Sequence, residues 1–422
     1  MRDPSSRGVV RWSALGATLV VCAFGLVTTA LAFRAETIDL EVYRAGAAAV
    51  LAGAPLYETA VWQDMQFTYP PFAALLFAPL ALLGSAVATG VVAAGNSALL
   101  VYVSSRCWRS AGTHTGSKLL VVSLVTASAL LATETVHVTL YLGQINFVLL
   151  ALVLGDLLRD DPKRTKGIGL GIAAGIKLTP LIFVLYLLLT RRFRAAAVAT
   201  GTFAATIAAG FLLLPGDAAR YWLSGAVGDV SRIYPDPYSA HNQSVRGLLL
   251  RSGFTVDDVG PFWLGAGVLV SAVVFVTAAL ASRRGEELLA LTLVGMCGAA
   301  LSPWSWGHHW MWVLPLAVVA VARVAVFRAW WVPVAMLPFT FPHVLALADP
   351  PDEDAQQPVL SGFPAFVVGN LYVLVFVAAV VVSICHLRSR AARAGHRAHA
   401  EDQSWRKSAT AVRKAGLLPT IP

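Results

Sequence analysis

The sequence predicts an all-helical protein that crosses a membrane about twelve times. Three properties of the chain favour this class: 57% of its 422 residues are hydrophobic, only 13% are charged, and the mean hydropathy is +0.69. Soluble globular proteins carry about 25% charged residues. The chain therefore has too little polar surface for a large soluble domain.

Apolar runs follow one another along most of the chain. They cover residues 12–33, 70–105, 118–133, 144–159, 167–190, 195–214, 262–282, 286–302, 309–326, 329–347 and 362–386. A helix needs about 20 residues to cross a bilayer, so most of these runs are expected to be membrane helices. The first run exceeds the roughly 7–15 residues of a signal-peptide core and is expected to remain as an uncleaved helix.

Two of these runs allow more than one arrangement. The run 70–105 is long enough for one crossing with extra residues, or for two crossings. The run 167–190 is interrupted at Lys177 and Pro180, and a proline breaks a helix. We favour one crossing for 70–105 and a segment that enters and returns for 167–190. The alternative, two crossings followed by one, would place two basic loops outside.

The basic residues sort the loops, because cytoplasmic loops carry an excess of lysine and arginine. Basic links fall at 106–118, 159–166, 191–194, 283–284 and 323–328. If these links are cytoplasmic, the outer loops are 34–69, 134–143, 215–261, 302–309 and 349–361, and short surface helices are expected in them. Residues 1–386 are then one membrane domain.

The segment 387–422 is rich in arginine and lysine. Basic residues beside a final span are typical of a cytoplasmic end that faces anionic lipid. We therefore predict a disordered cytoplasmic tail here, in preference to a contact with nucleic acid.

Common cofactor signatures are absent from the sequence. It contains no GxxxxGKS/T phosphate loop, no HExxH pair and no CxxC pair among its four cysteines. We expect no cofactor and no obligatory metal, with a divalent cation at Asp64 as the alternative.

The first outer loop, 34–69, begins with an acidic stretch. Asp39 and Tyr43 are spaced i, i+4, which places both on one face of a short helix expected at the membrane surface. An aspartate has an ordinary pKa of about 3.9 and is ionised at neutral pH. Asp39 is therefore a candidate base for a sugar hydroxyl, and capping of the helix is the alternative role.

Polar side chains also gather around the short outer loop 134–143. Glu134 and His137 lie in this loop, and Gln144 and Asn146 open the next apolar run. All four are candidates for contacts with sugar hydroxyls, although amides at a membrane surface also bond neighbouring helices. Tyr43, Asp64 and Tyr69 of the first loop join this set of candidates.

Lys177 is unusual because it interrupts an apolar run. A lysine inside the membrane costs about 2.5–3.5 kcal/mol on insertion scales, so it normally has a partner or faces a cavity. The phosphate of a lipid carrier is a suitable partner. A structural pair with a buried carboxylate, or a side chain that snorkels to the membrane surface, is the alternative.

The long outer loop 215–261 contains aromatic and amide side chains, which are typical of carbohydrate recognition. Tyr238, Asn242 and Gln243 are candidates for sugar contacts, and Arg246 is a candidate for the donor phosphate. A loop simply folded over the bundle would also use tyrosine, proline and asparagine.

The segment 302–310 has the sequence SPWSWGHHW. Trp306 is a candidate for stacking on a sugar, although tryptophans are also typical of the interfacial aromatic belt. His308 or His309 could give a hydrogen bond or a full charge to a departing phosphate. Adjacent histidines point in different directions on a helix, so both are not expected to bind one metal ion.

Six short motifs occur in an order that resembles one known family. They are DLEVYRAGAAAVLAGAPLY, YPPFAALLFAPL, GQIN, GIAAGIKLTPLIFVLYLLLTRR, NQSVRG and SPWSWGHHW. Over residues 12–386 they resemble the polyprenyl-phosphate-mannose-dependent mannosyltransferases of actinobacterial cell envelopes, within the GT-C superfamily.

The resemblance implies a GT-C fold and an inverting enzyme of the plasma membrane with an extracytoplasmic active site. Its donor would be polyprenyl phosphate mannose. Its acceptor would be a phosphatidylinositol mannoside, lipomannan or lipoarabinomannan, joined through an α-1,2 linkage. The family's catalytic aspartate falls on Asp39, and its histidine near the donor phosphate falls on His308 or His309.

Other functions stay open on the residues alone. A lipid or sugar transporter, or a flippase, would suit the break at Lys177, but no internal repeat is visible and the polar groups gather on one side. A non-catalytic scaffold would leave the acidic loop, the histidine pair and the lysine unexplained. A related enzyme with another sugar or linkage is the third alternative.

Overall fold

The computed structural model of the protein describes residues 37–112, 116–159, 164–229, 232–234, 236–327, 344–349 and 358–389, with the side chains of 323–327 left out. The predicted spans 12–33 and 329–347, the loop 349–361 and the tail 387–422 lie wholly or mostly outside these residues. The chain divides into two compact units, Met1–Phe376 and Val377–Pro422. This boundary falls inside the helix Leu371–Ser389, and the predicted end of the membrane domain at residue 386 stays a prediction.

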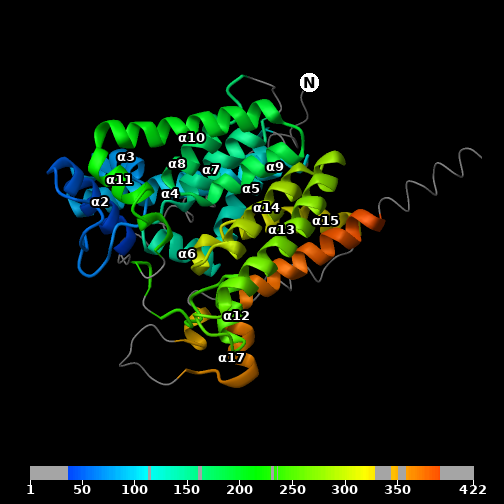
Figure 1. The fold of residues 1–422 in the computed structure, drawn as a ribbon. Helices are drawn as coiled ribbons and strands as arrows, with labels where there is room; N and C mark the ends of the chain where they lie inside the picture. Colours follow the sequence, from blue (N-terminus) through cyan, green and yellow to red (C-terminus); the bar gives the residue numbers. More distant parts are fainter. Residues whose placement is uncertain are drawn as a thin grey trace, which may run out of the picture. The chain divides into compact units, whose positions relative to one another are not determined.

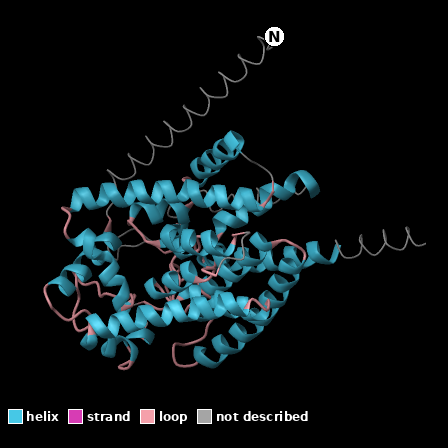
Figure 2. Ribbon diagram, turned by 90° about the horizontal axis from the view of Figure 1, so that it is seen from above, coloured by secondary structure: helices cyan, strands magenta, loops and turns pink. Residues whose placement is uncertain are grey.

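The described residues form helices joined by loops, with no strand among them (Figure 2). The prediction of an all-helical protein is confirmed. The α-helices are α2 (Ile38–Leu51), α3 (Pro71–Ala81), α4 (Ser85–Ser110), α5 (Gly116–Leu130), α6 (Glu134–Tyr141), α7 (Asn146–Leu157), α8 (Ile168–Ile176), α9 (Ile182–Leu189), α10 (Phe193–Leu213), α11 (Pro215–Trp222), α12 (Val245–Arg251), α13 (Val259–Arg283), α14 (Glu287–Leu301), α15 (Val313–Phe327), α17 (Gly362–Gly369) and Leu371–Ser389. The 3₁₀ turns are η1 (Thr179–Leu181), η2 (Ala226–Gly228), η4 (Gly307–His309) and η6 (Val344–Leu347).

Four described helices are long and apolar enough to cross a bilayer: α4, α10, α13 and Leu371–Ser389. A fifth crossing results if α5 and α6 are counted as one span, although the two helices meet at a bend of 83°. The protein is therefore a multi-pass membrane protein. The other apolar helices among the described residues are shorter, so a total of twelve crossings stays a prediction.

The run 70–105 forms one long helix preceded by a short one. The short helix α3 has 11 residues and the long helix α4 has 26. At about 1.5 Å per residue, only α4 is long enough to span the hydrocarbon core by itself. This division suits the favoured arrangement of one crossing with extra residues.

The run 167–190 folds into α8, the turn η1 and α9. Gly167, just before α8, and Gly171 and Gly175 within it pack on α10 in matching order: Gly167 on Ala195, Gly171 on Ala199 and Thr202, and Gly175 on Thr206. The helices α8 and α10 therefore run in the same direction (Figure 1). Because α9 connects the end of α8 to the start of α10, it must run back.

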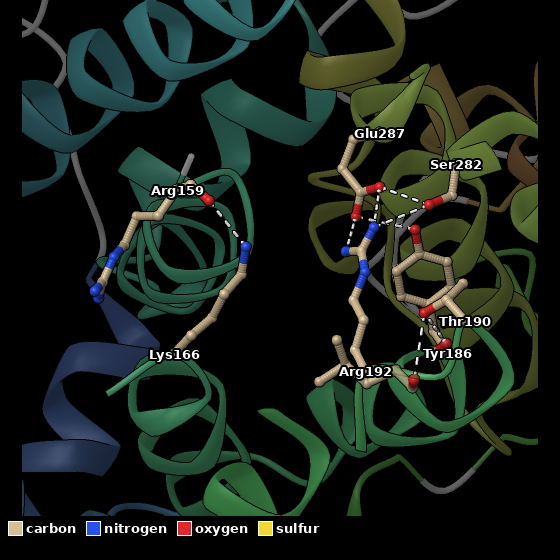
Figure 3. Close-up of polar contacts among 8 residues, drawn as sticks. Arg159, Lys166, Tyr186, Thr190, Arg192, Ser282 and Glu287 are labelled. Atoms are coloured by element: carbon tan, nitrogen blue, oxygen red, sulfur yellow. Dashed lines mark hydrogen bonds and ion pairs between the residues drawn. The ribbon is translucent and has the colours of Figure 1, made fainter. Parts of the chain in front are cut away.

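The basic links between helices meet at one end of the first unit. Lys166, just before α8, lies within electrostatic reach of Arg192, just before α10. Arg192 forms an ion pair with Glu287, which also accepts hydrogen bonds from Tyr186 (3.0 Å) and Ser282 (2.8 Å) (Figure 3). We call this region, with Arg106 and Arg159, the basic end.

The remaining contacts at the basic end join its helices. Arg106 of α4 donates to the carbonyl of Leu158, just after α7, at 2.8 Å, and Lys166 donates to the carbonyl of Arg159 at 2.9 Å (Figure 3). The helix α7 ends at the basic end, since Leu158 follows its last residue, and α14 begins there with Glu287. Figure 1 shows α13, α14 and α15 as neighbours, and α14 is buried along most of its length.

Candidate active site

The start of α2 is fixed to the turn between α6 and α7. The backbone N–H of Thr37 donates to the carbonyl of Tyr141 (3.1 Å), and that of Leu40 donates to Leu142 (3.2 Å). Gly143 in the turn has a φ of 69°, and a Cβ added there would lie 2.8 Å from Leu40 Cβ. Glycine is the residue that allows both this backbone conformation and this approach.

Asp39 lies in the first turn of α2, one residue after the helix begins. The N-cap is Thr37, and no side chain caps the helix, so the alternative that Asp39 is the N-cap is wrong. Burial raises the pKa of Asp39 to about 6, while a hydrogen bond from the Gln144 side chain and the positive charge of Lys177 act in the opposite direction. The carboxylate is therefore mostly ionised at neutral pH but protonates just below it.

Tyr43, Tyr69 and Gln144 form a buried group beside Asp39. The Tyr43 hydroxyl donates to Gln144 Oε1 at 2.9 Å and lies 2.9 Å from the Tyr69 hydroxyl. The ring of Phe77 stacks on that of Tyr43, with the ring centres 4.6 Å apart. The predicted i, i+4 relation of Asp39 and Tyr43 therefore places both side chains at one Gln144 amide.

Lys177 lies at the break between α8 and η1, where its backbone is extended. Its ammonium group is 5.5 Å from the centre of the Tyr69 ring and within electrostatic reach of Asp39. Among the described residues, no direct ion pair joins Lys177 to a carboxylate. Its charge is therefore available to an anionic ligand.

The SPWSWGHHW segment reaches the same region through η4. Asn146 at the start of α7 donates to the carbonyl of His308 at 2.9 Å. The rings of His308 and His309 are perpendicular, with an interplanar angle of 87°. Burial, followed by the charge of Lys177, lowers the pKa of both histidines well below the ordinary value. Both imidazoles are therefore neutral at pH 7 and can give hydrogen bonds but no full charge.

A cavity opens between α7, η1, α14 and the SPWSWGHHW segment. Its polar lining consists of Asn146, Lys177, Thr179, Ser302, Ser305 and His309. Its apolar lining includes Leu149, Leu150, Val153, Ile182, Phe183, Met311 and Trp312. A cavity with a cationic part and an apolar wall suits an anion that is attached to a hydrocarbon chain.

Ser305 is a site residue that the sequence did not indicate. Its side chain is fully buried, lines the cavity, and its hydroxyl has no hydrogen-bond partner among the described residues. Nε2 of His308 also has no hydrogen-bond partner among the described residues, but His308 does not line the cavity. Buried polar atoms normally have partners, so both atoms are open to a ligand or to water.

Asn242 and Gln243 support the SPWSWGHHW segment instead of facing the cavity. Gln243 Nε2 donates to the carbonyls of Ala240 and Gly369, both at 2.7 Å, and its Oε1 accepts from the backbone N–H of Tyr372. Asn242 Oδ1 accepts from Ser244 and from the backbone of Ser305. The hydrogen bonds of both amides are thus largely used within the fold, and neither residue lines the cavity.

Two charged residues near these amides behave differently from each other. Arg246 is half-buried, makes no described hydrogen bond and does not line the cavity. Arg251, which the sequence did not indicate, donates to the carbonyls of Ser239 (2.6 Å) and Asn242 (2.9 Å) and to Asn370 Oδ1 (2.8 Å). It is therefore the arginine that holds this part of the loop.

Other expected site residues lie around the cavity or away from it. Glu134 is buried and accepts from the Tyr372 hydroxyl at 2.9 Å, beside Gly307 of η4. His137 stacks near Tyr141 on α6. Trp306 is partly exposed and packs against His308 and Tyr234.

Asp64 and Tyr238 are exposed on loops. Neither side chain makes a described contact with the residues of the cavity. Among the described residues, no three histidine, cysteine, aspartate or glutamate side chains gather as metal ligands.

These features define a membrane-embedded protein in which the Asp39 carboxylate lies within electrostatic reach of Lys177, in the lining of a cavity that also has an apolar wall. The profile of glycosyltransferase family 87 matches residues 67–303. A Mycobacterium tuberculosis protein named polyprenol-phosphate-mannose-dependent alpha-(1-2)-phosphatidylinositol mannoside mannosyltransferase is 32% identical over 336 residues, 71% of this chain and 77% of the relative. The chain belongs to glycosyltransferase family 87, and it is a glycosyltransferase.

Two further relatives come from Mycolicibacterium smegmatis. One has the same name and is 32% identical over 367 residues, 78% of this chain and 82% of the relative. The other is named as the corresponding pentamannoside mannosyltransferase and is 34% identical over 332 residues, 75% of this chain and 78% of the relative.

Proposed function

We propose that this protein is an inverting α-1,2-mannosyltransferase that moves mannose from polyprenyl phosphate mannose to a mannosylated glycolipid. The arrangement around Lys177 supports the proposal, because Lys177 lies within electrostatic reach of the Asp39 carboxylate and lines the cavity together with His309. The names of the relatives support the donor, the linkage and a phosphatidylinositol mannoside as the acceptor. Lipomannan and lipoarabinomannan are the other acceptors that the family resemblance suggests.

Asp39 is the catalytic base in this proposal. An acceptor hydroxyl attacks the anomeric carbon of the donor mannose, opposite the phosphate, and its proton passes to the Asp39 carboxylate as the new bond forms. The carbon–oxygen bond to the phosphate breaks, and the polyprenyl phosphate leaves with the bonding electrons. A positioned base typically contributes about 10²–10⁴-fold to such a rate.

Lys177 and His309 bind the departing phosphate. Both line the cavity, where a preorganised cation and donor stabilise developing charge better than water does. Because His309 is neutral, it adds a hydrogen bond without repelling Lys177. Ser305, whose hydroxyl has no described partner, supplies a further donor. The prenyl chain then lies along the apolar wall.

The finer features of the fold also belong to this proposal. We assign the chain a GT-C fold with about twelve crossings, the basic end to the cytoplasm and the cavity to the extracytoplasmic side of the plasma membrane, since basic loops favour the cytoplasm. The C-terminus is then cytoplasmic. No cofactor and no metal enter the proposed reaction.

A direct assay tests the function. Purified protein in lipid nanodiscs is supplied with polyprenyl phosphate mannose and, in separate reactions, phosphatidylinositol mannosides of different length. We expect an extended glycolipid that an α-1,2-mannosidase shortens again, at the same rate with and without EDTA. Loss of the rate in EDTA that returns with a divalent cation would instead place a cation in the reaction.

The assay also separates the alternatives. Transfer from another polyprenyl phosphate sugar, or a product that resists the α-1,2-mannosidase, would indicate a different sugar or linkage. If no sugar is transferred while the donor lipid changes leaflet in proteoliposomes, the protein is a flippase and the proposal fails.

A further inference from the structure

Tyr69, Tyr43 and Gln144 form a buried chain of side chains that leads to Asp39, and none of these three has a role in the proposed reaction. The three supporting side chains keep at most 8% of their surface exposed: Tyr43 1%, Gln144 2% and Tyr69 8%. They were expected to contact a sugar, but side chains so well covered have little surface left for one. Their contacts run to one another and toward Asp39 instead.

Chemistry fixes the direction of the hydrogen bonds in this chain. The Tyr43 hydroxyl donates to Gln144 Oε1 and accepts from the backbone N–H of Ile145. An amide oxygen only accepts and an amide nitrogen only donates. With its oxygen held by Tyr43, the Gln144 amide presents its NH₂ group to the Asp39 carboxylate, to which its side chain is hydrogen-bonded.

The amide is also held through its own backbone. The N–H of Gln144 donates to the carbonyl of Thr139 at 2.9 Å, and the Asn96 side chain of α4 donates to the carbonyl of Gln144 at 3.1 Å. Gly143 brings this turn against Leu40, one residue after Asp39. Gln144 therefore has a fixed position relative to the first turn of α2.

We propose that Gln144, oriented by Tyr43 and Tyr69, is a positioning residue that aims the Asp39 carboxylate at the acceptor hydroxyl and keeps it ionised. This inference rests on the proposed function of Asp39 as the base. A hydrogen bond to the charged form of a carboxyl favours that form. It also holds one carboxylate oxygen, which leaves the other free to take the proton.

The titratable and charged groups that face Asp39 come from three segments. They are Tyr43 of α2, Tyr69 before α3 and Lys177 after α8. Burial raises the pKa of both tyrosines, so both remain neutral phenols. Gln144 and Lys177 are therefore the two groups that favour the ionised carboxylate.

The test is the pH profile of kcat for Gln144→Leu, measured with the full-length protein in nanodiscs. We expect the acid limb, which reports Asp39, to rise by about one pH unit, so that the rate falls about fivefold at pH 6 and only about 1.1-fold at pH 8. The KM values for donor and acceptor should not change. Tyr43→Phe, a smaller change that keeps the amide, should move the limb less in the same direction.

Gln243→Leu is the matched control because it removes another buried amide whose described hydrogen bonds do not involve Asp39. It should lower the rate or the yield of folded protein equally at every pH. If Gln144→Leu does the same, or raises the acceptor KM with the acid limb unmoved, the inference is overturned.

The rate of Asp39→Asn keeps the inference separate from the proposed function. If Gln144→Leu does not fold, an unmoved acid limb in Tyr43→Phe overturns the inference. If Asp39→Asn keeps the wild-type rate, the proposed role of Asp39 fails, and the inference fails with it. An inactive Asp39→Asn with an unmoved limb in both other variants overturns the inference alone.

Discussion

At the scale of single residues, burial sets the charge of each group in the site. It raises the pKa of Asp39 to about 6 and lowers the pKa of His308 and His309 well below the ordinary value. The carboxylate can then accept a proton near neutral pH, while the imidazoles remain neutral beside Lys177. One ammonium group is thus the single full positive charge that the described cavity lining presents to a phosphate.

Asp39→Asn should lower kcat by about 10²–10⁴-fold, because an amide cannot take the proton. The yield and the Tm of the variant should not fall, since a partly buried charge has been removed. In the wild-type protein, the rate should be lost as the pH falls through about 6.

Glu41→Gln is the control for this substitution. Glu41 lies on the same turn but bonds Arg44 and Ser85, so its variant should keep a rate close to that of the wild type. An Asp39→Asn variant within about tenfold of wild type would remove Asp39 from the role of base.

The two histidines should differ when each is replaced by alanine. His309→Ala should lower kcat by about 10²-fold, as the loss of one donor to developing charge typically does. His308→Ala should cost less activity but lower the Tm, because its buried ring stacks on Trp306. Rates and Tm of the two purified variants decide this, and equal small losses would favour a role in the interfacial belt.

At the scale of the elements, small residues let α8 lie directly on α10. Gly171 and Gly175 lie four residues apart on one face of α8, and Gly167 contacts α10 just before the helix begins. Such small-residue faces allow close backbone approach between membrane helices. This contact fixes the position of α8 beside α10, and thereby the position of Lys177, the residue that follows α8.

Gly171→Ala should disturb this contact. The added Cβ would lie 2.6 Å from the carbonyl oxygen of Ala199, which belongs to the backbone and cannot easily move. We expect a loss of about 1–3 kcal/mol in stability, seen as a lower Tm. Gly201→Ala on α10 has no heavy atom within 4 Å of the added Cβ and should leave the Tm unchanged or higher. Equal Tm values for the two variants would contradict the close packing.

At the scale of the whole chain, the residues of the site come from segments far apart in the sequence. Tyr43 and Gln144 are 101 positions apart, and Asn146 and His308 are 162 apart. They meet opposite the basic end, where Lys166, Arg192 and Glu287 gather. A helical membrane protein can separate its two ends in this way because each helix carries the chain across.

Single cysteines test this arrangement in a chain whose four native cysteines have been replaced. Thr165→Cys and Arg194→Cys, on either side of the α8–α9 segment, should react with a membrane-impermeant maleimide from the same side. Asp64→Cys should react from the other side. In intact cells the impermeant maleimide should label the cysteine at 64 and leave those at 165 and 194 unlabelled. Labelling of 165 and 194 from opposite sides would mean that this segment crosses the membrane once.

Much of the architecture could be predicted from composition and spacing. The apolar runs gave the helices, the i, i+4 pattern placed Asp39 and Tyr43 on one face, and Pro180 marked the break beside Lys177. Helix lengths were harder to predict. Run 118–133, for example, forms α5 only as far as Leu130, and the chain then bends by 83° into α6, because hydropathy does not show where a turn begins.

The contacts within the site could not be predicted as well. The sequence around Asn242 and Gln243 has the composition of a sugar site, yet only the folded chain shows that backbone groups occupy these amides. Ser305 gave no signal beyond its place between two tryptophans. Arg246 and Arg251 are indistinguishable in sequence, and packing alone decides which of them forms hydrogen bonds.

The path of the α8–α9 segment has a mechanical consequence. The segment starts beside Lys166 and ends beside Arg192, both near Glu287 at the basic end. Lys177 lies at the turn between its two helices. The other ends of both helices therefore lie at the basic end. A change at the Arg192–Glu287 pair should therefore shift Lys177 and alter the lining of the cavity from a distance.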